Sequence, residues 1–161
     1  MQTPTPLTFP TVQADNLEGK TLRFPQDFAG THNLVFVAFQ RNQQREVDTW
    51  VPLAKELMRK HPTLRTYEFP VIGKMIGMMR SFVNNGMRRG IPDPATRATT
   101  ITIYSDKGAF MRPLGLKDQK KIYAFLVTPK GEILWQTEGP RTESGEKSLR
   151  EFLDKASKPG G

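Results

Sequence analysis

The stretch Asn33-Leu-Val-Phe-Val-Ala-Phe-Gln-Arg-Asn-Gln-Gln-Arg45 decides the fold class of this chain. Its first half, Leu34 to Phe39, is a short, continuous apolar run without the polar alternation of a half-exposed strand, which predicts a strand buried on both faces. Its second half is polar and leads into a predicted helix. A strand followed by a polar turn and a helix is the usual position of chemistry in an α/β fold. Here the turn holds amides and guanidinium groups but no thiol, carboxylate or imidazole.

The segments on both sides predict an α/β fold. Apolar spacing predicts a helix from Gln43 to Lys60, bent at Pro52. Leu64 to Phe69 follows as a second strand, and the helix between the two strands implies that they run parallel. A hairpin is expected ahead of the central strand, and a strand, a second hairpin and a last helix after it. These lie at residues 7–12 with 21–24, then at 99–104, 123–127 with 132–137, and 145–156.

A second unusual stretch, Val71 to Ile91, contains no Asp or Glu. On a helical wheel of about 100° per residue, eight apolar residues share an arc of about 180°, wider than the roughly 100° that a helix needs to cover one core. They are Ile72, Met75, Ile76, Met78, Met79, Phe82, Val83 and Met87. The opposite arc is polar and basic, with Lys74, Arg80, Ser81, Asn84 and Arg88, and Arg89 follows at the helix end. The pattern predicts an amphipathic helix over residues 72–89.

Length and composition limit the classes of protein to which this chain can belong. The chain has 161 residues, which favours one domain over residues 1–161. Lys and Arg number 24 against 16 Asp and Glu, and the net charge of +8 favours anionic partners. No apolar run is long enough to span a bilayer, and Met1 to Pro10 does not have the pattern of an intact secretory signal. We expect a soluble protein, cytoplasmic if bacterial or associated with the mitochondrial inner membrane if eukaryotic.

The chain contains no cysteine, which excludes disulfides, thiol nucleophiles and cysteine-ligated metals of its own. Its two histidines, His32 and His61, are expected to be plain surface or turn residues. Asp106, Asp118 and Glu132 lie in or beside predicted turns without metal-ligand spacing, so turn formation explains them better than acid–base catalysis. We therefore expect no metal and no cofactor.

The predicted order of elements resembles the peroxiredoxin-like branch of the thioredoxin fold. Three phrases agree with it: Asn16-Leu-Glu-Gly-Lys20 near the start, Leu34-Val-Phe-Val-Ala-Phe39 as the first central strand, and the closing hairpin from Ala124 to Trp135. The resemblance implies a central mixed sheet flanked by helices and preceded by an N-terminal hairpin.

The same resemblance places Asn42 and Arg45 where active members carry their two cysteines, and Ile122 where they carry a cis-proline. Thiol–disulfide exchange requires a thiolate, which no amide replaces. The loop residues Arg41, Asn42, Gln43, Gln44 and Arg45, together with Ile122, are then remnant positions of a redox site. On this basis we expect a redox-inactive protein that is not an enzyme.

Further phrases are similar to the mitochondrial ATP-synthase assembly-factor family, whose domain is thioredoxin-like. They are Phe39-Gln40, Met87-Arg-Arg-Gly-Ile-Pro92, Gly115-Leu116, Lys121 to Val127, and Ile133-Leu-Trp135. The resemblance implies a non-catalytic assembly or chaperone-type factor for a membrane complex, with ATP-synthase subunits as protein partners.

Two surfaces are candidate binding sites. The first is the Met- and Arg-rich helix, as a contact for a protein or for an anionic membrane surface; its expected contact residues are Lys74, Met75, Met78, Met79, Arg80, Phe82, Arg88 and Arg89. The alternative is an ordinary core helix packed on the sheet with its basic residues in solvent. Both hold if one flank, such as Met75 and Ile76, is buried while Met78 and Phe82 are exposed. The second is the loop from Gln40 to Arg45, as a generic peptide-binding site; the alternative is a solvated helix start. Nucleic-acid binding through the net charge ranks last, because no recognition motif accompanies the basic residues.

Overall fold

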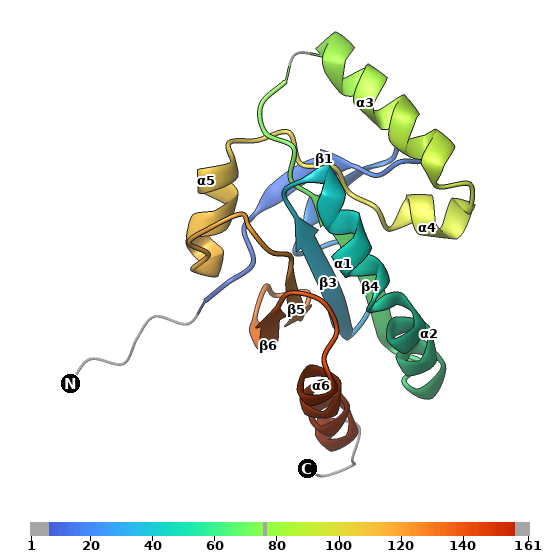
Figure 1. The fold of residues 1–161 in the computed structure, drawn as a ribbon, viewed down its shortest axis with the longest axis vertical. Coiled ribbons are helices and arrows are strands. Elements are labelled where there is room, and N and C mark those ends of the chain that lie inside the picture. The colour runs from blue at the N-terminus through green and yellow to red at the C-terminus, as the bar shows by residue number, and fades with distance from the viewer. Residues whose placement is uncertain (1–6, 76, 157–161) are drawn as a thin grey trace, which may run out of the picture.

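The centre of the structure, a computed structural model that describes residues 7–75 and 77–156, is a four-stranded sheet (Figure 1). Its strands are β3 (His32–Ala38), β4 (Leu64–Pro70), β5 (Tyr123–Val127) and β6 (Ile133–Glu138), in the order β4-β3-β5-β6. β3 runs parallel to β4 and antiparallel to β5, and β5 is antiparallel to β6. The sheet is mixed, as predicted.

Both faces of β3 are buried, which confirms the interpretation of the central apolar run. Successive side chains of a strand point to opposite faces. Leu34 and Phe36 accordingly pack into one hydrophobic cluster, and Val35 and Val37 pack into another on the other side of the sheet. Each of these four side chains is at most 3% exposed. The strand can be apolar throughout because neither face meets water.

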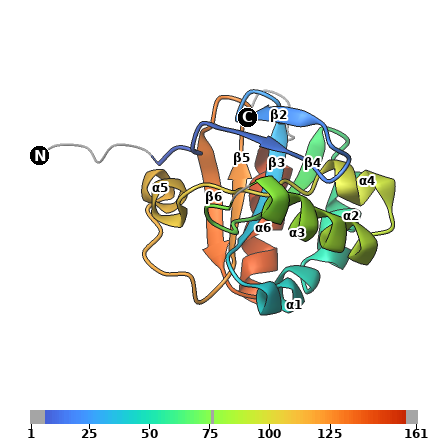
Figure 2. The ribbon, with the colours of Figure 1, turned by 90° about the horizontal axis from the view of Figure 1, so that it is seen from above.

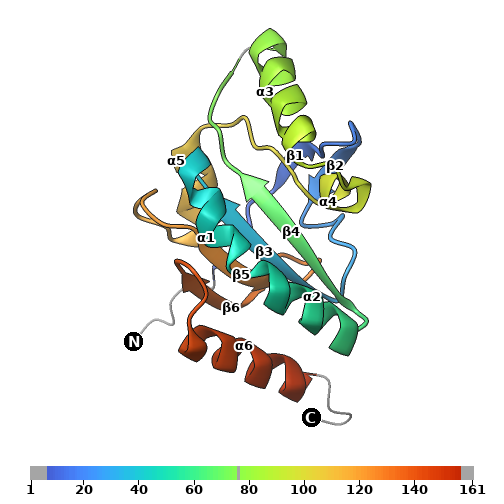
Figure 3. The same ribbon diagram turned by 45° about the vertical axis from the view of Figure 1, so that its right-hand side comes forward.

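Three helices cover one face of the sheet (Figures 1 and 3). They are α1 (Gln44–Asp48), which follows the short 3₁₀ helix η1 (Arg41–Gln43), then α2 (Val51–Lys60) and α6 (Glu143–Ala156). The predicted long helix is interrupted at Thr49 and Trp50, and Pro52 lies in the first turn of α2, where its missing N–H removes no helical hydrogen bond. The predicted bend at Pro52 is therefore a break between two helices.

The other face is covered by the hairpin of β1 (Val12–Asp15) and β2 (Thr21–Phe24) and by α5 (Lys107–Met111), which leads into η2 (Arg112–Leu114) (Figure 2). The core beneath them is rich in aromatic rings, with Phe9, Phe24, Phe28, Tyr67, Phe69 and Phe110 in mutual contact. The hairpin pairs antiparallel as expected, but its first strand begins at Val12 rather than at Leu7.

The predicted strand over residues 99–104 is not regular. Thr100 and Ile103 form only isolated parallel bridges to Glu68 and Val71 at the outer edge of β4. Immediately ahead of it lies an unexpected helix, α4 (Pro94–Ala98), whose first turn is capped by the side chain of Asp93. The cap accepts a hydrogen bond from a backbone N–H that the helix leaves unpaired, which stabilises even so short a helix.

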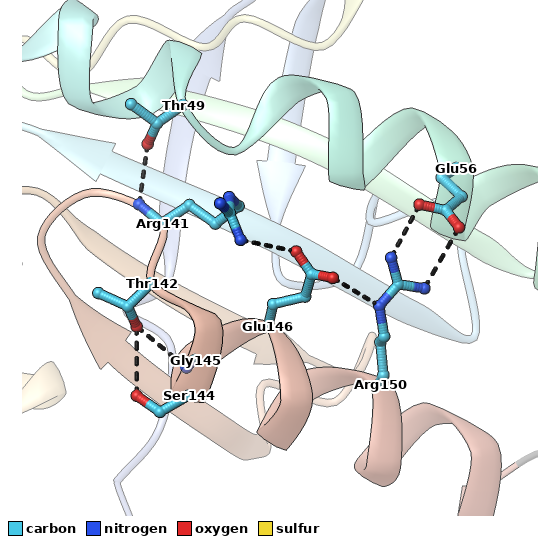
Figure 4. A network of polar contacts seen from close by, with 8 residues as sticks. All are labelled: Thr49, Glu56, Arg141, Thr142, Ser144, Gly145, Glu146 and Arg150. Atoms are coloured by element: carbon cyan, nitrogen blue, oxygen red, sulfur yellow. Dashed lines mark hydrogen bonds and ion pairs between the residues drawn. The ribbon is translucent and has the colours of Figure 1, made fainter.

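A network of ion pairs fastens α6 to α2 (Figure 4). The guanidinium of Arg150 donates to both carboxylate oxygens of Glu56 on α2 and to Glu146 one turn earlier on α6. Glu146 also accepts from Arg141, whose backbone N–H donates to the Thr49 hydroxyl between α1 and α2. The hydrogen bonds from Arg150 lower the pKa of Glu56. The network fixes α6 beside α2 over one face of the sheet.

Candidate functional site

The Met- and Arg-rich segment forms helix α3 (Gly77–Gly90), which begins five residues later than predicted. The backbone N–H groups of Ile72 and Gly73 donate to the carbonyl of Ile103, which holds this part of the chain extended beside the sheet. Gly73 has a φ of +98°, a value that no α-helix contains. Ile76, assigned to the buried flank in the sequence analysis, lies outside the described residues.

No residue of α3 is buried, so the interpretation of this segment as a core helix is wrong. Met78 is 82% exposed, Phe82 77% and Met79 48%. Figures 1 and 3 show why, because α3 lies at one end of the molecule, beyond the edge of the sheet. Met75, just before the helix, is half-buried.

Polar contacts hold the opposite side of α3 against the body. The side-chain oxygen of Asn84 accepts hydrogen bonds from the hydroxyls of Thr102 and Tyr104. The guanidinium of Arg80 lies over the Tyr104 ring, 5.2 Å from its centroid. Beyond the helix, Arg97 donates to the carbonyls of Arg88 and Ile91, next to the end where α3 leaves carbonyls unpaired. The helix is thus attached by its polar arc and presents its apolar arc to solvent.

Four basic residues accompany the exposed apolar side chains: Lys74, Arg80, Arg88 and Arg89, all of them exposed. Arg80 is engaged, because its Nε also donates to the carbonyl of Met75 at 2.8 Å. Within the described part of the chain, the side chains of Lys74, Arg88 and Arg89 make no hydrogen bond or ion pair with protein groups. We call Met78, Met79 and Phe82, with Lys74, Arg88 and Arg89, the α3 face.

The second predicted site, the loop from Gln40 to Arg45, divides into an inner and an outer part. Gln43 is 3% exposed, and its side-chain oxygen accepts from the N–H groups of Phe39 and Gln40 at 2.7 and 3.1 Å. Its side-chain nitrogen donates to the carbonyl of Gln119 at 2.7 Å. Because both ends of the amide are used internally, Gln43 is a structural residue that ties the loop to the segment ahead of β5.

The outer part of the loop consists of Arg41, Asn42 and Arg45, which are exposed and whose side chains have no hydrogen-bond or ion-pair partner in the described residues. Gln44 donates to Asp48 on the next turn at 2.9 Å. Ile122, the last of the predicted remnant positions, is fully buried in the cluster beneath α2 and α6. It supplies packing to the core and no polar group to the loop.

The histidines are not plain surface residues. His61 ends α2 and is 7% exposed, with its Nε2 3.6 Å from a carboxylate oxygen of Asp154 on α6. His32 is half-buried at the start of β3. Burial, and then the neighbouring His61, lower the pKa of His32. Both imidazoles belong to the packing at the end of the sheet far from α3.

Sequence reasoning missed one group near the loop, the half-buried carboxylate of Glu68 on β4. Burial is the largest cause that raises the pKa of Glu68, and the nearby charge of Asp48 raises it further, while a hydrogen bond from Gln44 opposes the shift. The Gln44 amide thus lies between two carboxylates. Glu68 carried no sequence signal, because it occupies an ordinary polar position in an alternating strand.

Replacing Glu68 with Gln tests this electrostatic arrangement. An acid whose folded pKa is raised binds more protons folded than unfolded, so stability falls as pH rises above about 4.5, the unfolded value. We expect Glu68→Gln to raise the urea midpoint at pH 7 and to leave it nearly unchanged below pH 4.5. The exposed Glu151→Gln is the matched control and should show no such difference. A loss of stability at pH 7 in Glu68→Gln would contradict the arrangement.

With this geometry established, the fold can be compared with solved structures. BsSco, a member of the Sco family of cytochrome c oxidase assembly proteins, is 15% identical in sequence to this chain. The two structures align with a TM-score of 0.64 over 96% of each chain. The thiol:disulfide interchange protein DsbE from Chlorobium tepidum is 14% identical, with a TM-score of 0.57 over 96% of this chain and 99% of that chain.

The thioredoxin domain of a thiol-disulfide oxidoreductase from Bacteroides vulgatus is 15% identical, with a TM-score of 0.60 over 94% of this chain and 99% of that chain. The chain has a thioredoxin-like fold. Identity this low shows the fold alone. The sequence matches no protein-family model and no curated protein. The predicted fold class, a thioredoxin-like mixed sheet flanked by helices with an N-terminal hairpin, is confirmed.

The expectation of a redox-inactive protein that is not an enzyme requires correction. Two of these thioredoxin-like neighbours are named for thiol-disulfide chemistry, so this fold supports redox catalysis. The lack of cysteine removes the chain's own thiolates, but it does not exclude a redox role that uses other groups or a partner's thiols. Absence of cysteine was too narrow a basis for excluding catalysis by the whole protein.

Proposed function

We propose that the protein is an assembly or chaperone-type factor that works at a membrane complex and docks there through the α3 face. The observation that carries the proposal is the exposure of Met78 and Phe82, at 82% and 77%, on a helix held in place by its polar side. Large apolar side chains grouped on one exposed surface mark an interaction site rather than a folding element. Met side chains in addition adapt to partners of different shape.

ATP synthase is the complex that we propose. Two points support this proposal. Short phrases of the sequence, including Met87 to Pro92 at the end of α3, resemble the ATP-synthase assembly-factor family, and the thioredoxin-like fold is similar to that of BsSco, whose family is named for the assembly of cytochrome c oxidase. Lys74, Met75, Met78, Met79, Arg80, Phe82, Arg88 and Arg89 are the contact residues of this proposal.

Site-specific photo-cross-linking in the native cell tests the proposed function. A photoreactive phenylalanine analogue placed at Phe82 or at Asn42, each on the tagged full-length chain, should capture subunits of ATP synthase from detergent-solubilised membranes. The same analogue at Lys130, an exposed turn position away from both sites, is the control. Subunits of a different membrane complex would make the ATP-synthase assignment wrong. Capture that is no richer in membrane-complex subunits than at Lys130 would overturn the assembly role.

A generic peptide-binding module is the second candidate, and one observation favours it. Arg41, Asn42 and Arg45 are exposed together just after β3, and their side chains have no hydrogen-bond or ion-pair partner among residues 7–75 and 77–156. Two guanidinium groups beside a free amide can bind a carboxylate and an extended backbone. In the cross-linking experiment this candidate predicts that Asn42 captures varied proteins with no enrichment of membrane-complex subunits over the Lys130 control.

A further inference from the structure

We propose that the partner of the α3 face is an anionic bilayer surface, on which α3 lies flat with Met78, Met79 and Phe82 inserted among the headgroups. This inference rests on the proposed function, since it names what the docking face contacts at the membrane complex.

The exposed apolar side chains form one compact group. At about 100° per residue, Phe82 lies about 40° around the helix from Met78, one turn further along. Met79 lies about 100° from Met78 and widens the group on one side. The exposed large hydrophobic residues in the described part of the chain are Leu7, Met78, Met79 and Phe82, so most of them share this surface. Met and Phe are side chains that enter the boundary between headgroups and acyl chains readily.

One basic side chain lies on the apolar side of the helix and another borders it. Arg89 lies only about 20° around the helix from Met78, three turns further along, while Arg88 lies about 80° from Met78 on the side away from Phe82 and Met79, at the border with the polar arc. Lys74 precedes the helix, so the apolar group has basic residues beyond both of its ends. No acidic residue occurs between Glu68 and Asp93 to repel lipid phosphates. Arginine binds phosphate oxygens in a bidentate manner, and each basic residue near an anionic leaflet strengthens attachment.

The orientation of the helix is fixed in the way that this contact requires. Thr102 and Tyr104 hold Asn84, on the side of α3 that faces away from Met78. The guanidinium of Arg97 donates hydrogen bonds to the carbonyls of Arg88 and Ile91 at the C-terminal end of α3. These contacts prevent the helix from rolling its apolar arc onto the body. The face can then meet a flat surface without rearrangement of the fold, because α3 lies at one end of the molecule (Figures 1 and 3).

The length of α3 fits an in-plane position. Its 14 residues extend about 21 Å, which is less than the roughly 30 Å of a bilayer core. Among the described residues, no helix is long and apolar enough to cross a membrane. The helix therefore lies on the bilayer and is held by shallow apolar contact together with charge.

The alternative occupant is an apolar groove of a protein. Helices that bind such grooves present anchors at i, i+3, i+4 and i+7 along one stripe. On α3 the stripe through the two most exposed anchors, Met78 and Phe82, continues with Asn85 and Arg89. The apolar residues further along the helix, Val83 and Met87, lie to the side of this stripe and are half-buried. A groove would have to bury Asn85 and Arg89, whereas a headgroup layer hydrogen-bonds to both. The sequence of side chains along the stripe thus favours lipid.

Vesicle flotation with the purified full-length chain tests the proposal. The probes are vesicles of phosphatidylcholine alone and vesicles in which about one third of the lipid is anionic phosphatidylglycerol. We expect at least tenfold stronger binding to the anionic vesicles, reduced by high salt because screening weakens the attraction of the basic residues. The Met78→Ser/Phe82→Ser variant and the Arg88→Gln/Arg89→Gln variant should each bind about tenfold more weakly.

Two controls make the result specific to α3. Lys117→Gln/Lys120→Gln removes the same number of charges from an exposed loop distant from α3 and should bind like the unaltered chain. Circular dichroism and urea midpoints should be unchanged in all variants, since the replaced side chains are exposed. The proposal is overturned if the unaltered chain does not float with anionic vesicles, if the Ser variant binds equally well, or if the Lys variant loses as much as the Arg variant.

These outcomes are independent of the cross-linking experiment. If the chain fails to bind vesicles but cross-links from Phe82 to a complex subunit, the occupant of the α3 face is protein; the lipid inference fails and the assembly role stands. If the chain binds vesicles through α3 and no membrane-complex subunit is captured, the lipid inference stands and the assembly role fails.

Discussion

Replacing Phe69 with Ala should cost about 3–5 kcal/mol of folding free energy, the usual range for truncating a buried phenylalanine. Phe69 is fully buried on β4, and its ring contacts those of Phe9, Phe24, Phe28 and Phe110. Its removal leaves a cavity bounded by four rings from three separate segments, which cannot all move inward together. Urea denaturation followed by circular dichroism measures the loss.

Phe82→Ala is the matched control for this prediction. It removes the same side chain from a position that is 77% exposed, so stability should change by no more than about 0.5 kcal/mol. If Phe69→Ala fails to fold, Phe69→Leu gives a smaller loss that can still be measured. Equal losses at positions 69 and 82 would show that α3 is packed in solution, which would invalidate the α3 face as well.

Replacing Gln43 with Met should destabilise the protein by about 2–4 kcal/mol, because it removes three hydrogen bonds while nearly preserving volume. The N–H groups of Phe39 and Gln40 both lose the side-chain oxygen of Gln43 as their acceptor, and that of Phe39 lies in a buried environment. The carbonyl of Gln119 loses the shorter of its two hydrogen bonds and keeps the one from the Gln40 side chain at 3.2 Å. A buried polar group left without a partner costs about 1–3 kcal/mol, less where water can reach it.

Gln136→Met on β6 serves as the control, since Gln136 is exposed and its side chain makes no hydrogen bond in the described structure. Its urea midpoint should match that of the unaltered chain. Faster amide hydrogen exchange at Phe39 and Gln40 in Gln43→Met would locate the effect in the loop. A midpoint for Gln43→Met that equals that of Gln136→Met would mean that the loop is held by other contacts.

The strands of the sheet were predictable because each is marked by a pattern in its own short stretch of sequence. An unbroken apolar run such as Leu34 to Phe39 favours burial on both faces, and Pro52 indicates an interruption of the helix close to its own position. The short helices α4 and α5 were not predicted, because each depends on one capping carboxylate, Asp93 or Asp106, that reads equally well as a turn residue.

The candidate sites were only partly predictable. Periodicity shows which residues of α3 share a side, but it does not show whether that side meets protein or solvent. The orientation of α3 depends on Thr102 and Tyr104, which donate hydrogen bonds to Asn84 from about twenty positions away in the chain. Similarly, the internal role of Gln43 depends on Gln119, which no local pattern connects to it. The distinction between a binding residue and a structural one was set by non-local hydrogen bonds in both places.

The exposure of the methionines on α3 also determines where oxidants attack this protein. Met78 and Met79 are accessible to peroxide, whereas Met111 is shielded at 6% exposure. Conversion of a thioether to the sulfoxide makes the side chain polar and is reversed by dedicated reductases. In this chain without a thiol, the most exposed sulfur atoms of the described residues thus lie on the surface that we propose for docking, and their oxidation is expected to weaken the proposed attachment to a bilayer.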